Sequence, residues 1–155
     1  MIEAGDKAPD VTLQMTDESE TKLSSFKGKP LVLYFYPRDD TPGCTKEALQ
    51  FTELAKEFDK AGVKVIGVSK DPPAKHEKFI AKHDLAIDLA TDADGSVTEA
   101  FGVWVEKNMY GRKYMGIQRA TFLIDAKGKV EKVWPKVKVA GHAEDVLAEA
   151  KALDA

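Results

Sequence analysis

The chain has 155 residues and a formal net charge of −3 at pH 7, with 43% hydrophobic and 32% charged residues. This length suits one domain spanning residues 1–155, and the weakly acidic balance gives no reason to propose nucleic acid or an anionic membrane as a partner. No apolar run reaches membrane-spanning length, and the N-terminus lacks a secretory pattern. The single cysteine excludes an internal disulfide framework, so we expect a cytoplasmic protein with a reduced thiol.

The first half of the chain predicts alternating strands and helices. Strands are expected over 11–15, 31–36 and 63–69, turns over 16–20 and 23–28, and helices over 42–60 and from 72 onward. The apolar residues of the first helix recur three and four positions apart: Cys44, Ala48, Phe51, Ala55 and Phe58. We expect this face to pack on the sheet, with Cys44 at its buried rim. On the second helix, Phe79 and Ile80 should point inward, and His76, Lys78 and Lys82 outward.

The second half predicts a short strand within 85–91, a helix over 96–101 capped by Ser96, a hairpin over 103–116 that turns at Tyr110-Gly111, strands over 120–124 and 130–134, and a helix over 143–152. The element order indicates an α/β fold with a mixed central sheet and helices on both faces.

Aromatic and histidine side chains add little to a functional prediction. Trp104, Tyr110 and Trp134 could line a substrate mouth, but we expect them to cover the core. The three histidines are far apart and lack metal-ligand spacing, so we expect surface helix residues and no metal or other cofactor: His76, His83 and His142.

The turn from the strand over 31–36 into the first helix carries the only cysteine. Thr41 is a good N-cap, Pro42 suits the first helical position, and Gly43 lets another group approach the backbone closely. Cys44 then lies in the first helical turn, where free backbone N–H groups and the helix dipole stabilise an anion such as a thiolate. The alternative for a lone cysteine is a buried, unreactive side chain.

Several motifs resemble the peroxiredoxins. Pro37, Thr41 and Cys44 match the active-site pattern Pro-x-x-x-Thr-x-x-Cys of that family. The wider string over 33–45 resembles the bacterioferritin-comigratory-protein branch, also called the Q type. The opening over 5–10 and the segments 109–117 and 119–125 match as well, so the resemblance covers nearly the whole chain.

The resemblance implies a thioredoxin-like fold and a thiol-dependent peroxidase, without a cofactor, that reduces hydrogen peroxide and organic hydroperoxides. Cys44 would be the nucleophile that becomes a sulfenic acid, and Arg119 the cation beside its thiolate. Thr41 and the amides of Gly43 and Cys44 would bind the peroxide, and Pro37 would shield the sulfur from water. The matching position Glu47 would either complement the helix dipole or orient an arginine, and the sequence favours neither role.

The chain departs from many members of this branch at Leu49, where they carry a second, resolving cysteine. The resemblance then implies a one-cysteine mechanism, recycled by an external thiol such as thioredoxin, glutaredoxin or glutathione. We expect a monomer. We also expect the helix over 42–51 to stay wound when Cys44 is oxidised, because no disulfide rewards its opening.

Two other function classes are considered. A thioredoxin-type exchange protein is disfavoured because the chain lacks Cys-x-x-Cys. A non-catalytic binding or chaperone-like module with the same fold is disfavoured by the complete set of Pro37, Thr41, Cys44 and Arg119.

Overall fold

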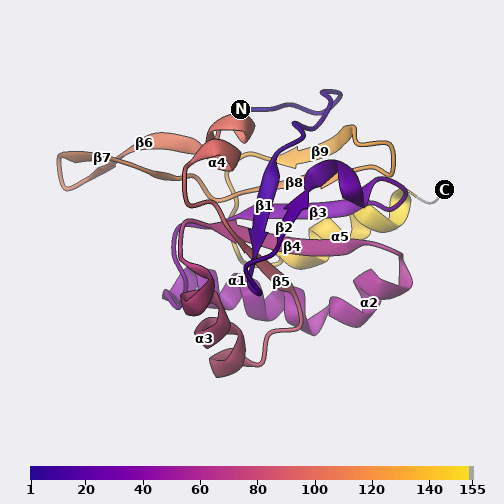
Figure 1. Ribbon diagram of the computed structural model, residues 1–155, viewed down its shortest axis with the longest axis horizontal. Helices are drawn as coiled ribbons and strands as arrows, with labels where there is room; N and C mark the ends of the chain where they lie inside the picture. Colours follow the sequence, from indigo (N-terminus) through magenta and orange to yellow (C-terminus); the bar gives the residue numbers. More distant parts are fainter. Residues whose placement is uncertain (154–155) are drawn as a thin grey trace.

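The computed structural model describes residues 1–153 as a central sheet with a separate two-stranded hairpin (Figure 1). The strands of the sheet are β1 (Thr12–Met15), β2 (Glu20–Lys22), β3 (Leu31–Phe35), β4 (Lys64–Ser69), β5 (Asp88–Thr91), β8 (Ala120–Ile124) and β9 (Val130–Trp134). The hairpin consists of β6 (Trp104–Met109) and β7 (Arg112–Ile117). The helices are η1 (Leu23–Phe26, a 3-10 helix), α1 (Pro42–Glu53), α2 (Ala55–Lys60), α3 (Pro73–His83), α4 (Ser96–Phe101) and α5 (His142–Ala152).

The sheet is mixed, as the sequence predicts. Its strand order is β2-β1-β5-β4-β3-β8-β9. The β3–β4 and β4–β5 pairs are parallel and the other neighbours are antiparallel. None of the helices within residues 1–153 is long and apolar enough to span a membrane.

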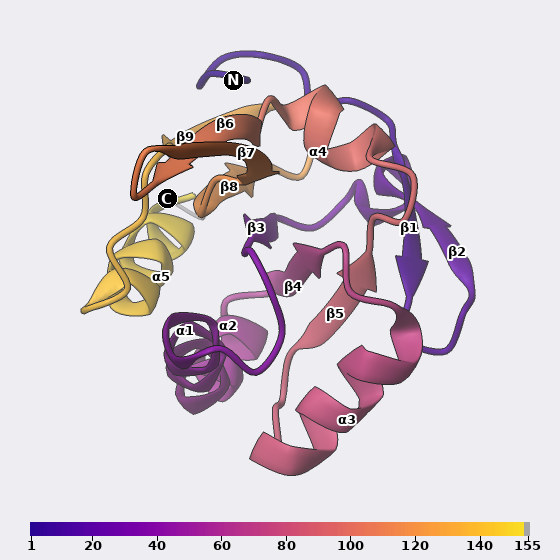
Figure 2. The same cartoon turned by 90° about the vertical axis from the view of Figure 1, so that its left-hand side faces the viewer.

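Helices cover both faces of the sheet, which confirms the predicted architecture (Figure 2). The central strand β3 shows why, because all five of its residues are buried and successive side chains point to opposite faces. Tyr34 stacks on Phe51 of α1 with ring centroids 4.8 Å apart, within the layer formed by α1, α2, α3 and α5. Phe35 packs on Phe101 of α4 at 5.3 Å, on the opposite face with the base of the hairpin.

Three local predictions were wrong. The helix expected over 42–60 is interrupted at Leu54, whose backbone has φ −99° and ψ 6°. Strand β2 lies in a short polar segment that carries almost no periodic signal. Gly95, with φ 82°, takes the N-cap position of α4 in place of Ser96. The carboxylate of Asp92 accepts hydrogen bonds from two amides of that helix, so the cap comes from outside the expected position.

Two of the three histidines are buried, contrary to the expectation of surface positions. His76 is fully buried in α3, whereas the neighbouring prediction that Lys78 and Lys82 point outward is confirmed. His142 is 4% exposed at the start of α5 and lies 2.8 Å from the Thr121 hydroxyl, and burial lowers the pKa of its ring to about 4. The predicted hairpin turn at Tyr110-Gly111 is confirmed, but Tyr110 is fully exposed and covers no core.

Candidate active site

The predicted site residues meet at one edge of the sheet because of strand direction. The parallel strands β3 and β4 end at the same edge, a common place for functional loops in α/β folds. Strand β8 runs antiparallel to β3 and pairs Ala120 with Phe35, so it begins where β3 ends. Arg119, which directly precedes β8, is therefore brought beside the helix that follows β3, although 75 residues separate it from Cys44 along the chain.

Arg119 lies between Cys44 and Glu47. Its Nη2 atom is 3.3 Å from Cys44 Sγ, and its Nη1 atom donates to Glu47 Oε1 at 2.7 Å. Cys44 and Glu47 are 2% and 1% exposed, respectively, and lie one turn apart on α1. The guanidinium thus joins a thiol and a carboxylate that water hardly reaches.

Burial shapes the electrostatics of this cluster. Burial raises the pKa of Glu47 to about 7, and the lowering effect of Arg119 does not offset it. Among the described residues, Oε2 of Glu47 is buried without a hydrogen-bond partner. Burial alone would lower the pKa of Arg119, but Glu47 and Cys44 outweigh it and raise that pKa above its ordinary value. The site therefore keeps a permanent cation in contact with the sulfur.

The first turn of α1 offers free backbone donors beside the sulfur. Thr41 has the extended backbone of an N-cap, with φ −91° and ψ 155°, and Pro42 follows at the first helical position. The Thr41 hydroxyl does not cap the helix as expected but donates to the Arg38 carbonyl at 2.9 Å. The amides of Gly43 and Cys44 precede the first intrahelical bond, which the Thr45 amide makes to the Thr41 carbonyl.

Gly43 is where the predicted close approach to the backbone occurs. A Cβ atom at this position would lie 3.1 Å from Arg119 Nη2, so a larger residue would displace the guanidinium. Pro37 is exposed and, together with Thr41, lines a groove of about 650 Å³ next to the site. The structure thus places Pro37, Thr41, Gly43, Cys44 and Arg119 around one end of α1.

The opposite wall of this groove comes from the β6–β7 hairpin. Its lining includes Trp104, Lys107, Met109, Tyr114 and Met115. The wall is therefore largely apolar, and it places side chains that could contact the organic part of a molecule close to the buried sulfur.

Comparison with known proteins identifies the family. The family model described as AhpC/TSA matches residues 4–133. The chain belongs to the AhpC/TSA family. A putative peroxiredoxin Bcp of Coxiella burnetii is 52% identical over 147 residues, which cover 94% of this chain and 97% of that protein.

Solved structures agree with this assignment to the AhpC/TSA family. The Xanthomonas campestris bacterioferritin comigratory protein, solved in work on its alkyl peroxide reduction activity, has 45% identity and a TM-score of 0.90, covering 97% of this chain and 98% of that chain. A cysteine-to-serine mutant of Xylella fastidiosa PrxQ has 37% identity and a TM-score of 0.93, covering 100% and 99%. The predicted thioredoxin-like fold and peroxiredoxin activity are confirmed, and the non-catalytic alternative is not favoured.

Sequence reasoning did not find every polar residue that surrounds the site of this AhpC/TSA member. Asp39 lies in the same loop as Thr41 and is 3% exposed, yet no sequence pattern singled it out. The available signal was its position, since Asp39 lies in the loop that follows the fully buried strand β3, at an edge of the sheet where functional loops often meet. For His76 the available signal was helical spacing, because it lies three residues before Phe79, which is buried on the same face of α3.

Proposed function

We propose that Cys44 is the peroxidatic nucleophile of a one-cysteine peroxiredoxin and that Arg119 stabilises its thiolate. The contact of 3.3 Å between Arg119 Nη2 and Cys44 Sγ carries this proposal. A cation at that distance favours the ionised sulfur, and the N-terminus of α1 adds a second stabilising field. The thiolate, rather than the thiol, is the form that attacks peroxide.

In the proposed reaction, the Cys44 thiolate attacks one oxygen of a hydroperoxide. A sulfur–oxygen bond forms, the oxygen–oxygen bond breaks, and the leaving oxygen takes a proton and departs as water or an alcohol. Sulfur loses two electrons and becomes a sulfenic acid, and the peroxide gains them. The guanidinium of Arg119 and the free amides of α1 face the place where negative charge develops on oxygen.

Thr41 and the first two free amides of α1 would hold the peroxide in line for this attack. The Thr41 hydroxyl donates its proton to the Arg38 carbonyl, which leaves its lone pairs free to accept from the hydroperoxide O–H. The amides of Gly43 and Cys44 would donate to the peroxide oxygens. Pro37, on the rim of the groove, would limit the access of water to the sulfur.

Regeneration would require a thiol from outside the chain, because the sequence has one cysteine. The external thiol condenses with the sulfenic acid to a mixed disulfide and water, and a second thiol releases Cys44. Thioredoxin, glutaredoxin and glutathione are the candidate reductants, and hydrogen peroxide and organic hydroperoxides the candidate substrates. The largely apolar hairpin wall of the groove supports the organic class.

We further propose that residues 1–155 act as one domain, as a monomer, in the cytoplasm. Support for this compartment is chemical, since a cysteine that depends on external thiols needs a reducing environment. Sedimentation of the reduced protein tests the monomer, and fractionation of cells tests the location.

The decisive experiment measures peroxide consumption by the parent protein and by Cys44→Ser, with thioredoxin, glutathione and dithiothreitol as alternative reductants. The parent should turn over with at least one of them, and the variant should have no turnover while keeping a native circular dichroism spectrum. Mass spectrometry after one equivalent of peroxide should show one added oxygen on Cys44. Undiminished turnover by Cys44→Ser would refute the assignment.

Oxidation should leave the helix over 42–51 intact. Leu49 is partly buried and packs against the core on the face of the sheet that α1, α2, α3 and α5 cover. Unwinding this segment would therefore expose apolar surface without forming a disulfide. Hydrogen exchange before and after stoichiometric oxidation measures this directly. A large loss of protection confined to 42–51 would contradict the expectation.

A further inference from the structure

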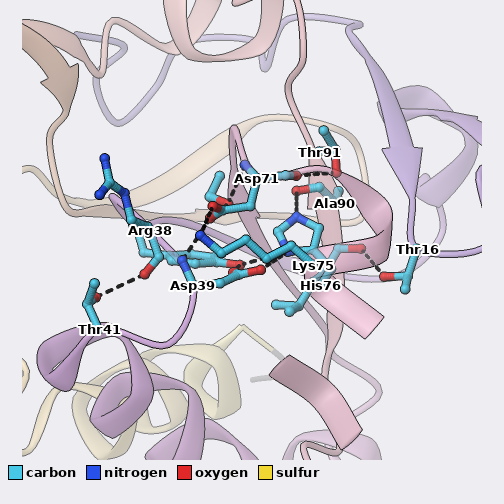
Figure 3. A network of polar contacts seen from close by, with 12 residues as sticks. Thr16, Arg38, Asp39, Thr41, Asp71, Lys75, His76, Ala90 and Thr91 are labelled. Atoms are coloured by element: carbon cyan, nitrogen blue, oxygen red, sulfur yellow. Dashed lines mark hydrogen bonds and ion pairs between the residues drawn. The ribbon is translucent and has the colours of Figure 1, made fainter. Parts of the chain in front are cut away.

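The loop over 37–41 is attached to the rest of the molecule through Asp39 (Figure 3). The Asp39 carboxylate accepts a hydrogen bond from the Tyr36 hydroxyl at 2.5 Å and faces His76 Nδ1 at 2.6 Å. The backbone amide of Asp39 donates to the Asp71 carboxylate at 2.7 Å. The backbone and the side chain of Asp39 are therefore held by three residues: Tyr36, Asp71 and His76.

His76 reaches Asp39 from α3 and is itself held on its other side. Its Nε2 atom lies 3.0 Å from the Ala90 carbonyl oxygen at the end of the fully buried part of β5. Both ring nitrogens thus face oxygen atoms, so the ring is held from two sides. The side chains of Asp39 and His76 are both fully buried. Such a pair seldom adds net stability over an apolar pair, so its clearest effect is to define one geometry.

The next residue of the loop is attached to the same helix. Asp40 contacts Lys82 Nζ at 2.7 Å and His83 Nε2 at 2.9 Å, both near the end of α3. Its backbone has φ 58°, a conformation that residues other than glycine seldom adopt without support from their surroundings. Two successive aspartates therefore fix the loop to α3.

One peptide unit connects these contacts to Thr41. The N–H of the peptide between Arg38 and Asp39 donates to Asp71, and its C=O accepts from the Thr41 hydroxyl at 2.9 Å. Because a peptide unit is planar, fixing its N–H also fixes its C=O. The direction of the Thr41 hydroxyl is then set by residues that lie outside the site.

We propose that Asp39 and His76, together with Tyr36 and Asp71, position Thr41 for peroxide binding. These four residues are positioning residues: they act through the peptide between Arg38 and Asp39 and need not touch the peroxide. The inference rests on the proposed function, since it assigns them to the peroxide-binding half of the reaction and leaves ionisation of the sulfur to Arg119.

Two reactions of Cys44 separate positioning from general stability. Oxidation by hydrogen peroxide requires Thr41 to orient the peroxide, whereas alkylation by iodoacetamide requires only an accessible thiolate. In Asp39→Asn and His76→Gln, the second-order rate of oxidation should fall about tenfold, since small misplacements of a binding group are costly. The KM for peroxide should rise with little change in kcat, and the alkylation rate should stay within about twofold of the parent.

The matched control is Asp92→Asn. Asp92 is also a buried carboxylate, 2% exposed, but it binds the amides of Val97 and Thr98 at the start of α4, on the other face of the sheet. This variant should lose stability and keep the parent oxidation rate. If Asp39→Asn or His76→Gln does not fold, Tyr36→Phe keeps the aromatic ring, removes one hydroxyl, and should still slow oxidation more than alkylation.

Oxidation within about twofold of the parent in the folded variants would overturn the proposal, as would an equal loss in Asp92→Asn or equal slowing of oxidation and alkylation. Absence of peroxide turnover in the parent protein would instead refute the proposed function. The two failures are therefore distinguishable.

Discussion

The two walls of the groove beside Cys44 are built in different ways. The loop over 37–41 is fixed by buried or partly buried polar contacts that join Asp39 to Tyr36, to Asp71 and to His76 of α3. The β6–β7 hairpin faces it with exposed apolar side chains, of which Met109 and Met115 are 55% and 49% exposed, and it projects from the sheet (Figure 1). The rigid loop wall suits peroxide binding, which needs fixed geometry. The hairpin is the adaptable wall, because flexible methionine side chains can fit organic groups of variable shape.

The largest effect should come from the contact between Arg119 and Cys44, which lies next to the rigid wall. Arg119→Ala should lower the rate of Cys44 oxidation about 100-fold, a loss typical of removing one stabilising donor, and should also slow alkylation at neutral pH because less thiolate is present. Rapid-quench measurements against hydrogen peroxide and iodoacetamide test both effects. The control is Arg38→Ala, which removes an exposed cation that lines the same groove. Equal losses in the two variants would show that general charge, rather than the contact with sulfur, matters.

The adaptable wall should affect only large substrates. Replacing Met109 and Met115 by Ser in one double variant should raise the KM for cumene hydroperoxide by up to about tenfold, because partial burial of two apolar side chains is lost. The KM for hydrogen peroxide should not change. Tyr110→Ser is the control, since Tyr110 is fully exposed at the tip of the hairpin. A parallel rise in both KM values would break the proposed division between the walls.

A smaller effect is expected at Gly43. Gly43→Ala should slow peroxide attack by roughly twofold to tenfold, because the added Cβ would lie 3.1 Å from Arg119 Nη2 and shift the guanidinium. The control is the double variant: adding Gly43→Ala to Arg119→Ala should cause no further loss if Gly43→Ala acts through Arg119. Additive losses would assign Gly43 an effect of its own.

The last effect concerns stability rather than turnover. Burial raises the pKa of Glu47 from 4.5 to about 7, so between these values the folded state binds the proton more strongly than the unfolded state. Stability from this group therefore falls as pH rises through that window. Glu47→Gln should remove this dependence, a change of about 3 kcal/mol in the free energy of unfolding across the window. Urea titrations from pH 4.5 to 8 test it, with the exposed Glu53→Gln on the same helix as control, and an identical slope in parent and Glu47→Gln would disprove it.

Local sequence patterns and the family resemblance together predicted most of the fold and the core of the site. The apolar run over 31–36 predicted the central strand, and helical spacing predicted the buried face of α1 that carries Cys44. The proximity of Arg119 came from the resemblance alone, since it depends on the antiparallel pairing of β3 with β8. The burial of His76 follows from its spacing of three residues from the buried Phe79, but its partner Asp39 could not be predicted, because a contact across 37 residues leaves no periodic pattern.

The presence of Leu49, where the family resemblance leads us to expect a second cysteine, has a consequence for reaction time. A resolving cysteine in the same chain reacts at a rate that dilution does not change, because its effective concentration is set by the tether. With Leu49 packed against the core, the proposed sulfenic acid must wait for a collision with another molecule. Halving the concentration of external thiol should therefore double the lifetime of the oxidised protein. The oxidised fraction would then record the balance between peroxide supply and thiol supply in the surrounding solution.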